Sequence, residues 1–313
     1  MSPSSFKEKV LDNDDRLYGY LFVLPDLMTF IAFLFIPVAT AFILSLFEWS
    51  TLGGAQGWVG LDNYINLLKP YPWENNFAPL RSPEANLWWY AVRNTVIYIT
   101  GVVPLAVYGG LGAALLLDSD IPGEDIVRAM YFIPVMLSPA AIAIIWRWIL
   151  ADQGIANEYL SLIGLSHNWA TSTATALPSV MLMAIWANIG FNMIIYLSGL
   201  QNIPSELYDA ARIDGAGTWE KFRNVTWPNL NDITFFVIVL AIINGFQVFA
   251  YAYVFAQGGP YNATTTIVVY IYQRGFGAGD LGSASAMAVM LFIFIFLFSY
   301  YQYTQRNQQE VSY

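Results

Sequence analysis

Residues 233–256 read ITFFVIVLAIINGFQVFAYAYVFA and contain no Asp, Glu, Lys or Arg. At 1.5 Å per residue, a helix of this length covers the hydrocarbon core of a bilayer, which is about 30 Å thick. Apolar stretches of 18 or more residues without charges are typical of transmembrane helices. This segment therefore predicts a membrane span.

The same pattern recurs along the whole chain. Of its 313 residues, 57% are hydrophobic and 11% are charged, whereas soluble domains carry roughly 25% charged residues. Apolar blocks bounded by Pro, Gly or charged residues predict six spans, at about 20–46, 91–117, 126–150, 177–200, 233–256 and 281–301. Prolines inside them predict kinks, at Pro25, Pro37, Pro104, Pro134 and Pro139. The expected fold is an all-α membrane protein with a transmembrane domain over 20–301.

The positions of Lys and Arg indicate the orientation, because both favour the cytoplasmic side of a membrane. With the N-terminus inside, eight basic residues fall in cytoplasmic segments and five fall in or beside external ones. The terminal segments 1–19 and 302–313 are therefore expected to be cytoplasmic. A long external loop follows over about 47–90, and its Gly, Pro and aromatic residues suit an ordered cap. A long cytoplasmic loop follows over 201–232, between the fourth and fifth spans.

The cytoplasmic loop predicts a helix-turn-helix. Pro204-Ser205 is typical of a helix start, and Glu206 lies where the positive end of the helix dipole favours an anion. One side of this helix carries Leu207, Ala210, Ala211 and Asp214, and Gly215 ends it. Thr218 is expected to cap a second short helix, which Pro228 closes. The small residues would let another protein approach this surface closely.

This loop resembles the EAA loop of ABC importer permeases. In that motif Glu-Ala-Ala is followed by three residues, Gly, nine residues and then Ile-x-Leu-Pro. Here Asp209-Ala210-Ala211 fill the triplet, Gly215 follows after three residues, and Val225-Thr226-Trp227-Pro228 follow after nine more. Asp for Glu and Val for Ile are conservative departures, whereas Trp227 for Leu alters the end of the loop. Because the family's first loop helix docks on a cytoplasmic ATPase, the resemblance implies an ATPase-coupling role for Glu206, Asp209, Ala210, Ala211, Gly215 and Pro228.

Nearly the whole chain is similar to carbohydrate-uptake permeases of the maltose and glycerol-3-phosphate type. The matching segments are Tyr20–Pro25, Val59–Tyr64, Tyr131–Pro134, Gly245–Phe249 and Gly258–Pro260. The resemblance implies import of a sugar or oligosaccharide by alternating access, with an external solute-binding protein that delivers it. It also implies two copies of an ATPase subunit, a second and different permease subunit, and a multi-pass location in the cell (inner or cytoplasmic) membrane.

The composition also limits what this chain can do by itself. No phosphate-binding G-x-x-x-x-G-K-[ST] loop occurs, so ATP and Mg²⁺ are expected on the ATPase subunits, and the chain is expected to be no enzyme. The absence of Cys and a single His, His167, leave no metal cluster. The net charge of −9 lacks the basic footprint of a nucleic-acid-binding protein. The excess of acidic residues is compatible with a halophilic source.

Amides inside two spans are the candidate substrate path, because polar groups at this depth normally face the bundle interior or a water-filled cavity. The candidates are Asn188, Asn192 and Tyr196 on one face of the fourth span, and Asn244, Gln247 and Tyr251 at i, i+3 and i+7 in the fifth. Amides pair with sugar hydroxyls, and aromatic rings cover the apolar face of a pyranose. The alternative is that these amides bond neighbouring helices as packing contacts.

Two other classes of protein fit the sequence less well. An ion-coupled secondary transporter would place Asp, Glu or His well inside its spans, and here only Asp26 and Glu48 lie near the membrane. A membrane-embedded enzyme would need an acid pair, a metal cluster or a nucleophile with its base. The sequence does not identify the sugar, and import of glycerol-3-phosphate or a polyol by the same mechanism remains an alternative.

Overall fold

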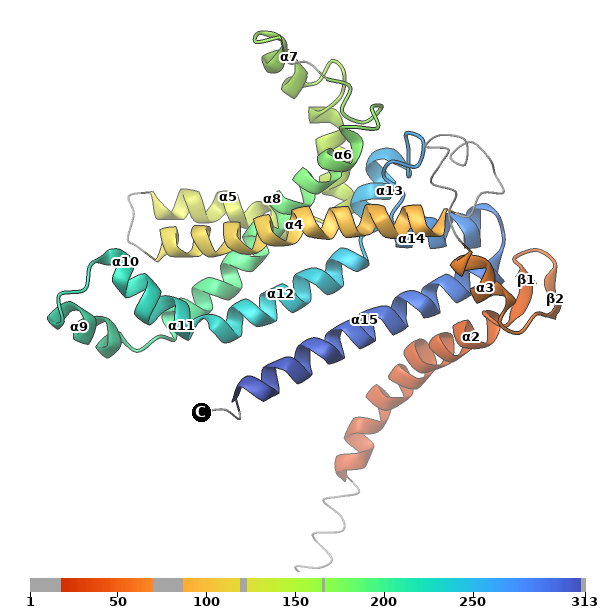
Figure 1. The fold of residues 1–313 in the computed structure, drawn as a ribbon, viewed down its shortest axis with the longest axis horizontal. Helices are drawn as coiled ribbons and strands as arrows, with labels where there is room; N and C mark the ends of the chain where they lie inside the picture. The colour runs from red at the N-terminus through yellow and green to blue at the C-terminus, as the bar shows by residue number, and fades with distance from the viewer. Residues whose placement is uncertain (1–17, 70–86, 119–122, 165–166, 311–313) are drawn as a thin grey trace, which may run out of the picture. The chain divides into compact units, whose positions relative to one another are not determined.

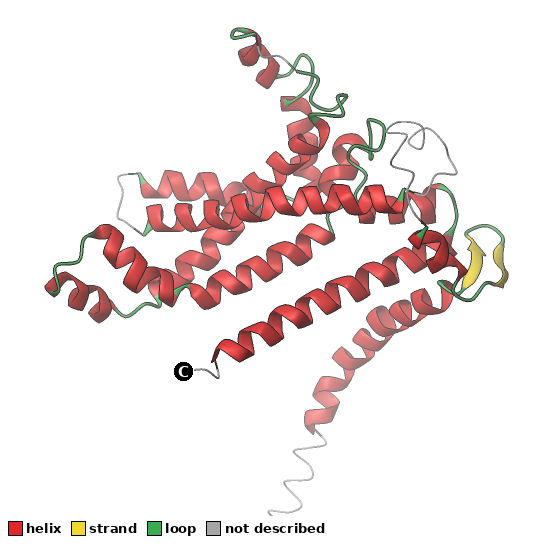
Figure 2. Ribbon diagram, in the orientation of Figure 1, coloured by secondary structure: helices red, strands yellow, loops and turns green. Residues whose placement is uncertain are grey.

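A computed structural model describes residues 18–69, 87–118, 123–164 and 167–310 (Figure 1). Helices and loops make up nearly all of this part of the chain, together with one two-stranded hairpin (Figure 2). Five of the described helices are long and apolar enough to cross a membrane, and a bent pair makes a sixth if it is counted as one span. The mostly helical membrane fold expected from the sequence is confirmed, with five to six spans.

The chain divides into two units, residues 1–65 with 274–289 and residues 66–273 with 290–313, which are described separately. The larger unit contains α4 (Trp88–Leu117), α5 (Glu124–Met136), α6 (Pro139–Ile149), α7 (Ile155–Ser161), α8 (Ala176–Gln201), α9 (Ser205–Ile213), α10 (Thr218–Lys221), a π-helical turn (Phe222–Thr226), α11 (Trp227–Asn229), α12 (Asn231–Phe246), α13 (Ala250–Ala256) and α14 (Ile267–Tyr272). A second π-helical turn (Gln273–Gly277) and α15 (Leu281–Glu310) follow.

Helices α4 and α8 pack side by side at the centre of the larger unit. Glycine allows the close approach, because a Cβ on Gly110 of α4 would lie 2.5 Å from the Cβ of Asn192 on α8. On another side of α8, a Cβ on Gly190 would collide with the carbonyl oxygen of Tyr131 on α5. The apolar core follows the α4–α8 contact in two clusters, which include Tyr98, Ile142, Met183 and Phe255 in one and Val107, Leu111, Met193 and Leu230 in the other.

The segment predicted as one kinked span over 126–150 is two helices, α5 and α6, bent by 110°. Helix α6 begins at Pro139, whose missing N–H costs no hydrogen bond at the first helical position. Ser138 before it is extended, as a residue preceding proline prefers. Its Oγ accepts a hydrogen bond from the N–H of Ala141 at 3.2 Å and so caps α6. The chain therefore turns a corner where the sequence predicted only a kink.

The segment predicted as a continuous span over 233–256 is also interrupted. Helix α12 ends at Phe246 and α13 begins at Ala250. In the break, the carbonyl of Val248 accepts a hydrogen bond from Oγ1 of Thr266 at 2.8 Å, and both residues are buried. A buried carbonyl without a partner is costly, so this bond stabilises the break. Helix α12 packs on α4, and α13 packs on α6.

The smaller unit contains the first apolar helix, Tyr18–Leu44, with a π-helical turn at Ile31–Phe35 before α2 (Ile36–Leu44). Strands β1 (Phe47–Ser50) and β2 (Gly54–Trp58) form an antiparallel hairpin, which the sequence analysis did not predict. The N–H of Thr51 donates to the carbonyl of Gly279 at 2.8 Å. Helix α3 (Asp62–Leu68) follows the hairpin. The described part of the 47–90 loop is therefore folded, and residues 70–86 lie outside the described residues.

The ends of the other spans lie within a few residues of the predicted ones, at Trp88–Leu117 and Ala176–Gln201. Helix α15 continues to Glu310, beyond the last candidate span, which covers Leu281–Gln305 against the predicted 281–301. The sequence of this tail contains Gln, Arg and Glu, which favour helix. The helix therefore continues after the apolar segment has ended. Residues 1–17 of the predicted N-terminal segment lie outside the described residues.

Candidate functional site

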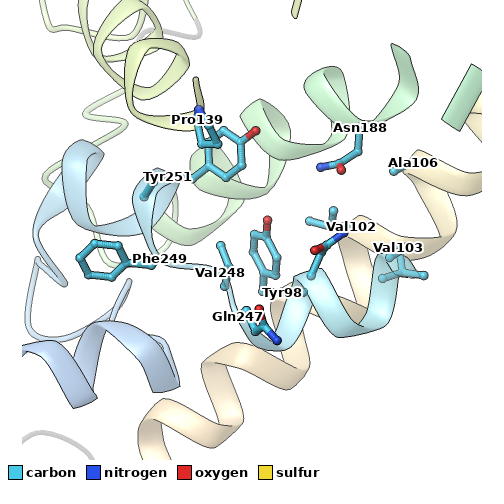
Figure 3. A pocket seen from close by; sticks show the side chains of 14 residues that line it. Tyr98, Val102, Val103, Ala106, Pro139, Asn188, Gln247, Val248, Phe249 and Tyr251 are labelled. Atoms are coloured by element: carbon cyan, nitrogen blue, oxygen red, sulfur yellow. The ribbon is translucent and has the colours of Figure 1, made fainter. Parts of the chain in front are cut away.

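A cavity of about 360 Å³ lies beside the break between α12 and α13. Its walls come from the middle of α4, the start of α6, the middle of α8 and the chain on both sides of the break, and they include Tyr98, Val102, Ala106, Pro139, Asn188, Asn244, Gln247, Val248, Phe249 and Tyr251 (Figure 3). The volume lies within the range of about 300–1,000 Å³ that is usual for small-molecule sites. Because its walls are mid-helix residues of apolar spans, the cavity lies near the mid-depth of the helix bundle.

The polar groups of this cavity are uncharged. They are the amides of Asn188, Asn244 and Gln247 and the phenol groups of Tyr98 and Tyr251. Figure 3 shows the hydroxyls of Tyr98 and Tyr251 and the amide of Asn188 directed toward the same space. No Asp, Glu, Lys, Arg or His side chain lines the cavity in the described part of the chain. The walls therefore offer hydrogen-bond donors and acceptors together with aromatic surface.

Three amides of the cavity differ in how they are held. Nδ2 of Asn188 donates to the carbonyl of Ala184, one turn earlier on α8, at 2.7 Å. The side chains of Asn244 and Gln247 are exposed and have no hydrogen-bond partner within the described residues. Exposed amides on an apolar membrane helix avoid lipid, because an unsatisfied polar group in hydrocarbon costs several kcal/mol. Asn244 and Gln247 therefore face water or another protein chain.

Two of the six predicted path residues do not line the cavity. Nδ2 of Asn192 donates to the carbonyl of Ala106 on α4 at 3.0 Å, and the residue is only 4% exposed. Tyr196, one turn further along α8, is completely buried in the core. Both contribute to the packing of α8, which is the alternative interpretation given above for such residues.

The helical spacing predicted for Asn244, Gln247 and Tyr251 does not hold, because the helix is broken between Phe246 and Ala250. The three residues nevertheless line the cavity together, on both sides of the interruption. Sequence reasoning missed Tyr98 and Phe249. Tyr98 carried a signal, since it is a polar-tipped aromatic residue near the middle of the second apolar block.

The 201–232 loop forms the helix-turn-helix that the sequence predicted (Figure 1). Helix α9 begins at Ser205 with Pro204 as its N-cap, and no residue of α9 is buried. Gly215 ends the helix with a φ of +78°, the left-handed conformation that glycine adopts at least cost. Ile213 is 87% exposed at the end of α9. A helix this open, with apolar residues in water, presents a surface that another molecule can cover.

A hollow of about 450 Å³ lies between α9 and the second helical segment. As the helical spacing predicts, one wall carries Leu207, Ala210, Ala211 and Asp214 together, and the other carries Glu220, Asn224 and Val225. The hydroxyls of Tyr208 and Thr226 lie 3.0 Å apart and connect the two segments. Asp209 and Arg212 form an exposed ion pair at 3.4 Å, and Glu206 and Pro228 are exposed nearby along the loop.

The second segment departs from the prediction at both ends. Gly217, not Thr218, is the N-cap, and its N–H donates to Oε2 of Glu220 at 2.7 Å. Pro228 does not close the segment, because helical structure continues to Asn229. Pro228 lies in the first turn of α11, after a π-helical turn, where a missing N–H breaks no hydrogen bond.

Comparison with known proteins assigns the family. Residues 106–307 match the model of the family described as binding-protein-dependent transport system inner membrane component. The chain belongs to this family. It is thus a permease, the membrane subunit of an ABC importer.

Curated relatives agree with this assignment. The permease is 30% identical over 270 residues to the probable ABC transporter permease protein YurN of Bacillus subtilis, with 84% of this chain and 87% of the relative covered. It is 34% identical over 261 residues to the arabinooligosaccharides transport system permease protein AraP of the same organism, with 82% and 78% covered. An ion-coupled secondary transporter is excluded by the family.

A solved structure shows the same fold. The permease superposes with a TM-score of 0.79 on a chain of a bacterial ABC transporter involved in the import of the acidic polysaccharide alginate, at 22% identity and with 96% and 98% of the two chains covered. The matched family region includes α8, the break between α12 and α13, and the 201–232 loop. The 201–232 loop and most of the cavity therefore lie within the region that matches the family. Within the described residues, no three His, Cys, Asp or Glu side chains are grouped to hold a metal ion.

Proposed function

We propose that the permease translocates a sugar or short oligosaccharide through the cavity beside the α12–α13 break. The observation that carries this proposal is the uncharged wall of amides and phenols, with Asn188, Gln247 and Tyr251 among them. Amides both donate to and accept from hydroxyls, and aromatic rings cover the apolar faces of pyranoses. The relative AraP belongs to an arabinooligosaccharides transport system, which supports the same class of cargo.

A phosphorylated cargo is less well supported by these walls. A phosphate normally binds Arg, Lys or a cluster of N–H donors, and no basic side chain among the described residues lines the cavity. Glycerol-3-phosphate is therefore the weaker candidate. A polyol such as glycerol shares its hydroxyl chemistry with a sugar, so the transport experiment below must include one.

The 201–232 loop is proposed to couple the permease to ATP hydrolysis. Helix α9 is exposed along its length, and the alanines on its hollow side leave room for a partner backbone. In this proposal an ATPase subunit contacts α9 and moves it, and α8 and α12 transmit the motion from either end of the loop. The residues assigned to this role are Glu206, Asp209, Ala210, Ala211, Gly215 and Pro228.

The functional assembly follows from the family and the absence of a phosphate-binding loop in the sequence. We propose two copies of a cytoplasmic ATPase subunit that bind ATP and Mg²⁺, a second and different permease subunit, and an external binding protein that delivers the sugar. The chain lies in the inner membrane with both termini in the cytoplasm, as the distribution of Lys and Arg predicts.

The class of cargo is tested with the transporter reconstituted together with its binding protein. Sugars, a polyol and glycerol-3-phosphate are compared for their stimulation of ATP hydrolysis and for uptake into vesicles. Gln247→Ala and Asn188→Ala should raise the half-saturating sugar concentration about tenfold, the loss expected for one or two hydrogen bonds to a ligand. Asn202→Ala, which removes an exposed amide at the end of α8, is the matched control. Unchanged sugar dependence in both cavity variants would refute the proposed path.

Deletion of residues 206–215 tests the coupling role. The shortened permease should still enter the membrane, because every apolar span is intact, but ATP hydrolysis should no longer drive uptake. Membrane content is measured by immunoblot of washed membranes, and coupling as sugar transported per ATP hydrolysed. Full transport by the deletion variant would disprove the docking role of α9.

A further inference from the structure

The second helical segment of the 201–232 loop, residues 218–229, has two different sides. It consists of α10, the π-helical turn and α11, and only Leu230 separates it from the first residue of α12 (Figure 1). One side packs on the protein, because Val225 and Thr226 are buried and Thr226 contacts the hydroxyl of Tyr208. The position of the segment is therefore fixed, and its other side is free to contact something else.

A row of three aromatic rings begins on the free side at Trp219 and continues through the half-buried Phe222 to Trp227, which packs against the core. Trp219 is 69% exposed and stacks on Phe222, with 5.5 Å between ring centroids and 27° between planes. Phe222 in turn contacts Trp227, with the centroids 6.2 Å apart. Trp227 is the residue that departs from the Leu of the family motif. The exposed indole of Trp219, held by its stack on Phe222, is an apolar surface of the kind that marks an interaction site.

The charges beside this row are mainly basic. Arg223 is exposed, one turn after Trp219, and Lys221 is half-buried. Neither forms an ion pair within the described residues. Glu220, the one acid of the segment, is turned back to the N–H of Gly217. Helix α9 differs, because it carries Glu206 and Asp209 and its only basic residue is paired.

We propose that residues 218–229 anchor the loop to the cytoplasmic membrane surface by binding anionic lipid headgroups. Tryptophan is enriched at the boundary between lipid and water, and basic side chains bind lipid phosphates there. The segment leads directly into α12, so it lies where α12 enters the bilayer. This proposal rests on the cytoplasmic orientation in the proposed function. It gives the two helical parts of the loop different partners, the ATPase for α9 and the membrane for Trp219, Lys221 and Arg223, while Pro228 at the end of the second part keeps its coupling role.

Spin labels test the depth of the segment directly, because the sequence has no Cys that would need to be removed. The variants Trp219→Cys and Ile213→Cys are labelled in the assembled transporter in nanodiscs of phosphatidylcholine with one third phosphatidylglycerol. Collision with oxygen, which concentrates in lipid, is compared with collision with a water-soluble nickel chelate. The label at position 219 should favour oxygen, and the label at 213 should be protected from both by the ATPase.

Two results would overturn the lipid proposal. A label at position 219 that meets the nickel chelate as freely as an exposed loop site would show that the segment lies in water. A label at 219 that is protected from both reagents, and becomes accessible when the ATPase is removed, would assign this surface to the ATPase instead. Neither result depends on which sugar is transported.

The basic residues are tested by lipid dependence. The double variant Lys221→Gln/Arg223→Gln should lose most of the stimulation of ATPase activity by phosphatidylglycerol, since each basic residue at an anionic surface contributes a factor of about five in binding. Arg212→Gln, which removes the basic charge of α9, controls for the loss of a charge and should respond to phosphatidylglycerol like the unmodified transporter. An unchanged response of the double variant refutes the proposal, whereas a failed proposed function would appear as lost sugar stimulation in every lipid mixture.

Discussion

The packed helices around α8 and the exposed 201–232 loop both depend on glycine, but for different physical reasons. At Gly190 the carbonyl oxygen of Tyr131 occupies the place of a Cβ, so the requirement is space. At Gly215 nothing lies within 4 Å of a Cβ position, but φ is +78°, so the requirement is backbone conformation. The first glycine sets how closely two helices approach, and the second sets how the chain leaves α9. Packing thus governs stability in the bundle, whereas local geometry governs the loop.

The largest loss of stability is expected from a substitution at Gly190. Gly190→Val places two methyl groups against a backbone carbonyl that cannot move without shifting α5, so it should destabilise the permease by about 3 kcal/mol or more. Thermal unfolding of the purified protein in detergent measures this as a lower midpoint. Gly112→Val is the matched control, because Gly112 on α4 has no atom within 4 Å of its Cβ position. Equal losses in the two variants would contradict the packing argument.

A smaller loss is expected at Asn94, which is buried on α4. Its Nδ2 donates to the carbonyls of Asn262 and Thr265, both at 3.0 Å. Asn94→Ala leaves these acceptors without their donor, which should cost about 2 kcal/mol. The same unfolding assay applies, with Asn202→Ala as the exposed amide control. A midpoint equal to that of the control would show that the two hydrogen bonds contribute nothing.

In the loop, Gly215→Ala should destabilise only the end of α9, by about 1 kcal/mol, because a Cβ disfavours the left-handed backbone. Hydrogen exchange of the α9 amides should accelerate, while the unfolding midpoint of the bundle stays constant. Gly215→Asn should recover part of the loss, since Asn adopts this conformation more readily than Ala. At Gly190 the order of the two substitutions should be reversed. Gly190→Asn should destabilise the protein more than Gly190→Ala, because the larger side chain needs more space.

The smallest effect is expected at the exposed ion pair of α9. Arg212 and Asp209 are 71% and 61% exposed and 3.4 Å apart. Such pairs contribute about 0–1 kcal/mol because solvent screens them. Arg212→Ala should change α9 hydrogen exchange by less than the Gly215→Ala variant does. A larger change would mean that charge, rather than the turn at Gly215, holds the end of α9.

The parts predicted well are those in which a local pattern decides the structure. The length of the apolar segments predicted the spans. Pro204 and Ser205 predicted the start of α9, and Gly215 predicted its end. The break between α12 and α13 was missed because it depends on a distant partner. Nothing near Val248 in the sequence reveals that Thr266 will bond its carbonyl. The β1–β2 hairpin was missed because the apolar and polar residues alternate only over the four residues of β1, Phe47–Ser50, and not over β2, Gly54–Trp58.

The candidate path was predicted only in part, for a related reason. Asn188 and Asn192 both lie in the middle of one apolar helix, and they have the same amide side chain. They differ in what lies opposite, since Asn192 meets the backbone of α4 at Ala106 and Asn188 meets the cavity. Sequence alone does not show which neighbour each face of α8 contacts. The assignment of these residues to a sugar path remains a prediction.

The interruption of the fifth span has a mechanical consequence. Its first half, α12, packs on α4, and its second half, α13, packs on α6. Because Gln247, Val248 and Phe249 lie outside both helices, we expect a shift of α6 against α4 to change their torsions without unwinding a helical turn. The same three residues border the cavity. Any rearrangement that opens one end of the permease therefore also reshapes the walls around its cargo.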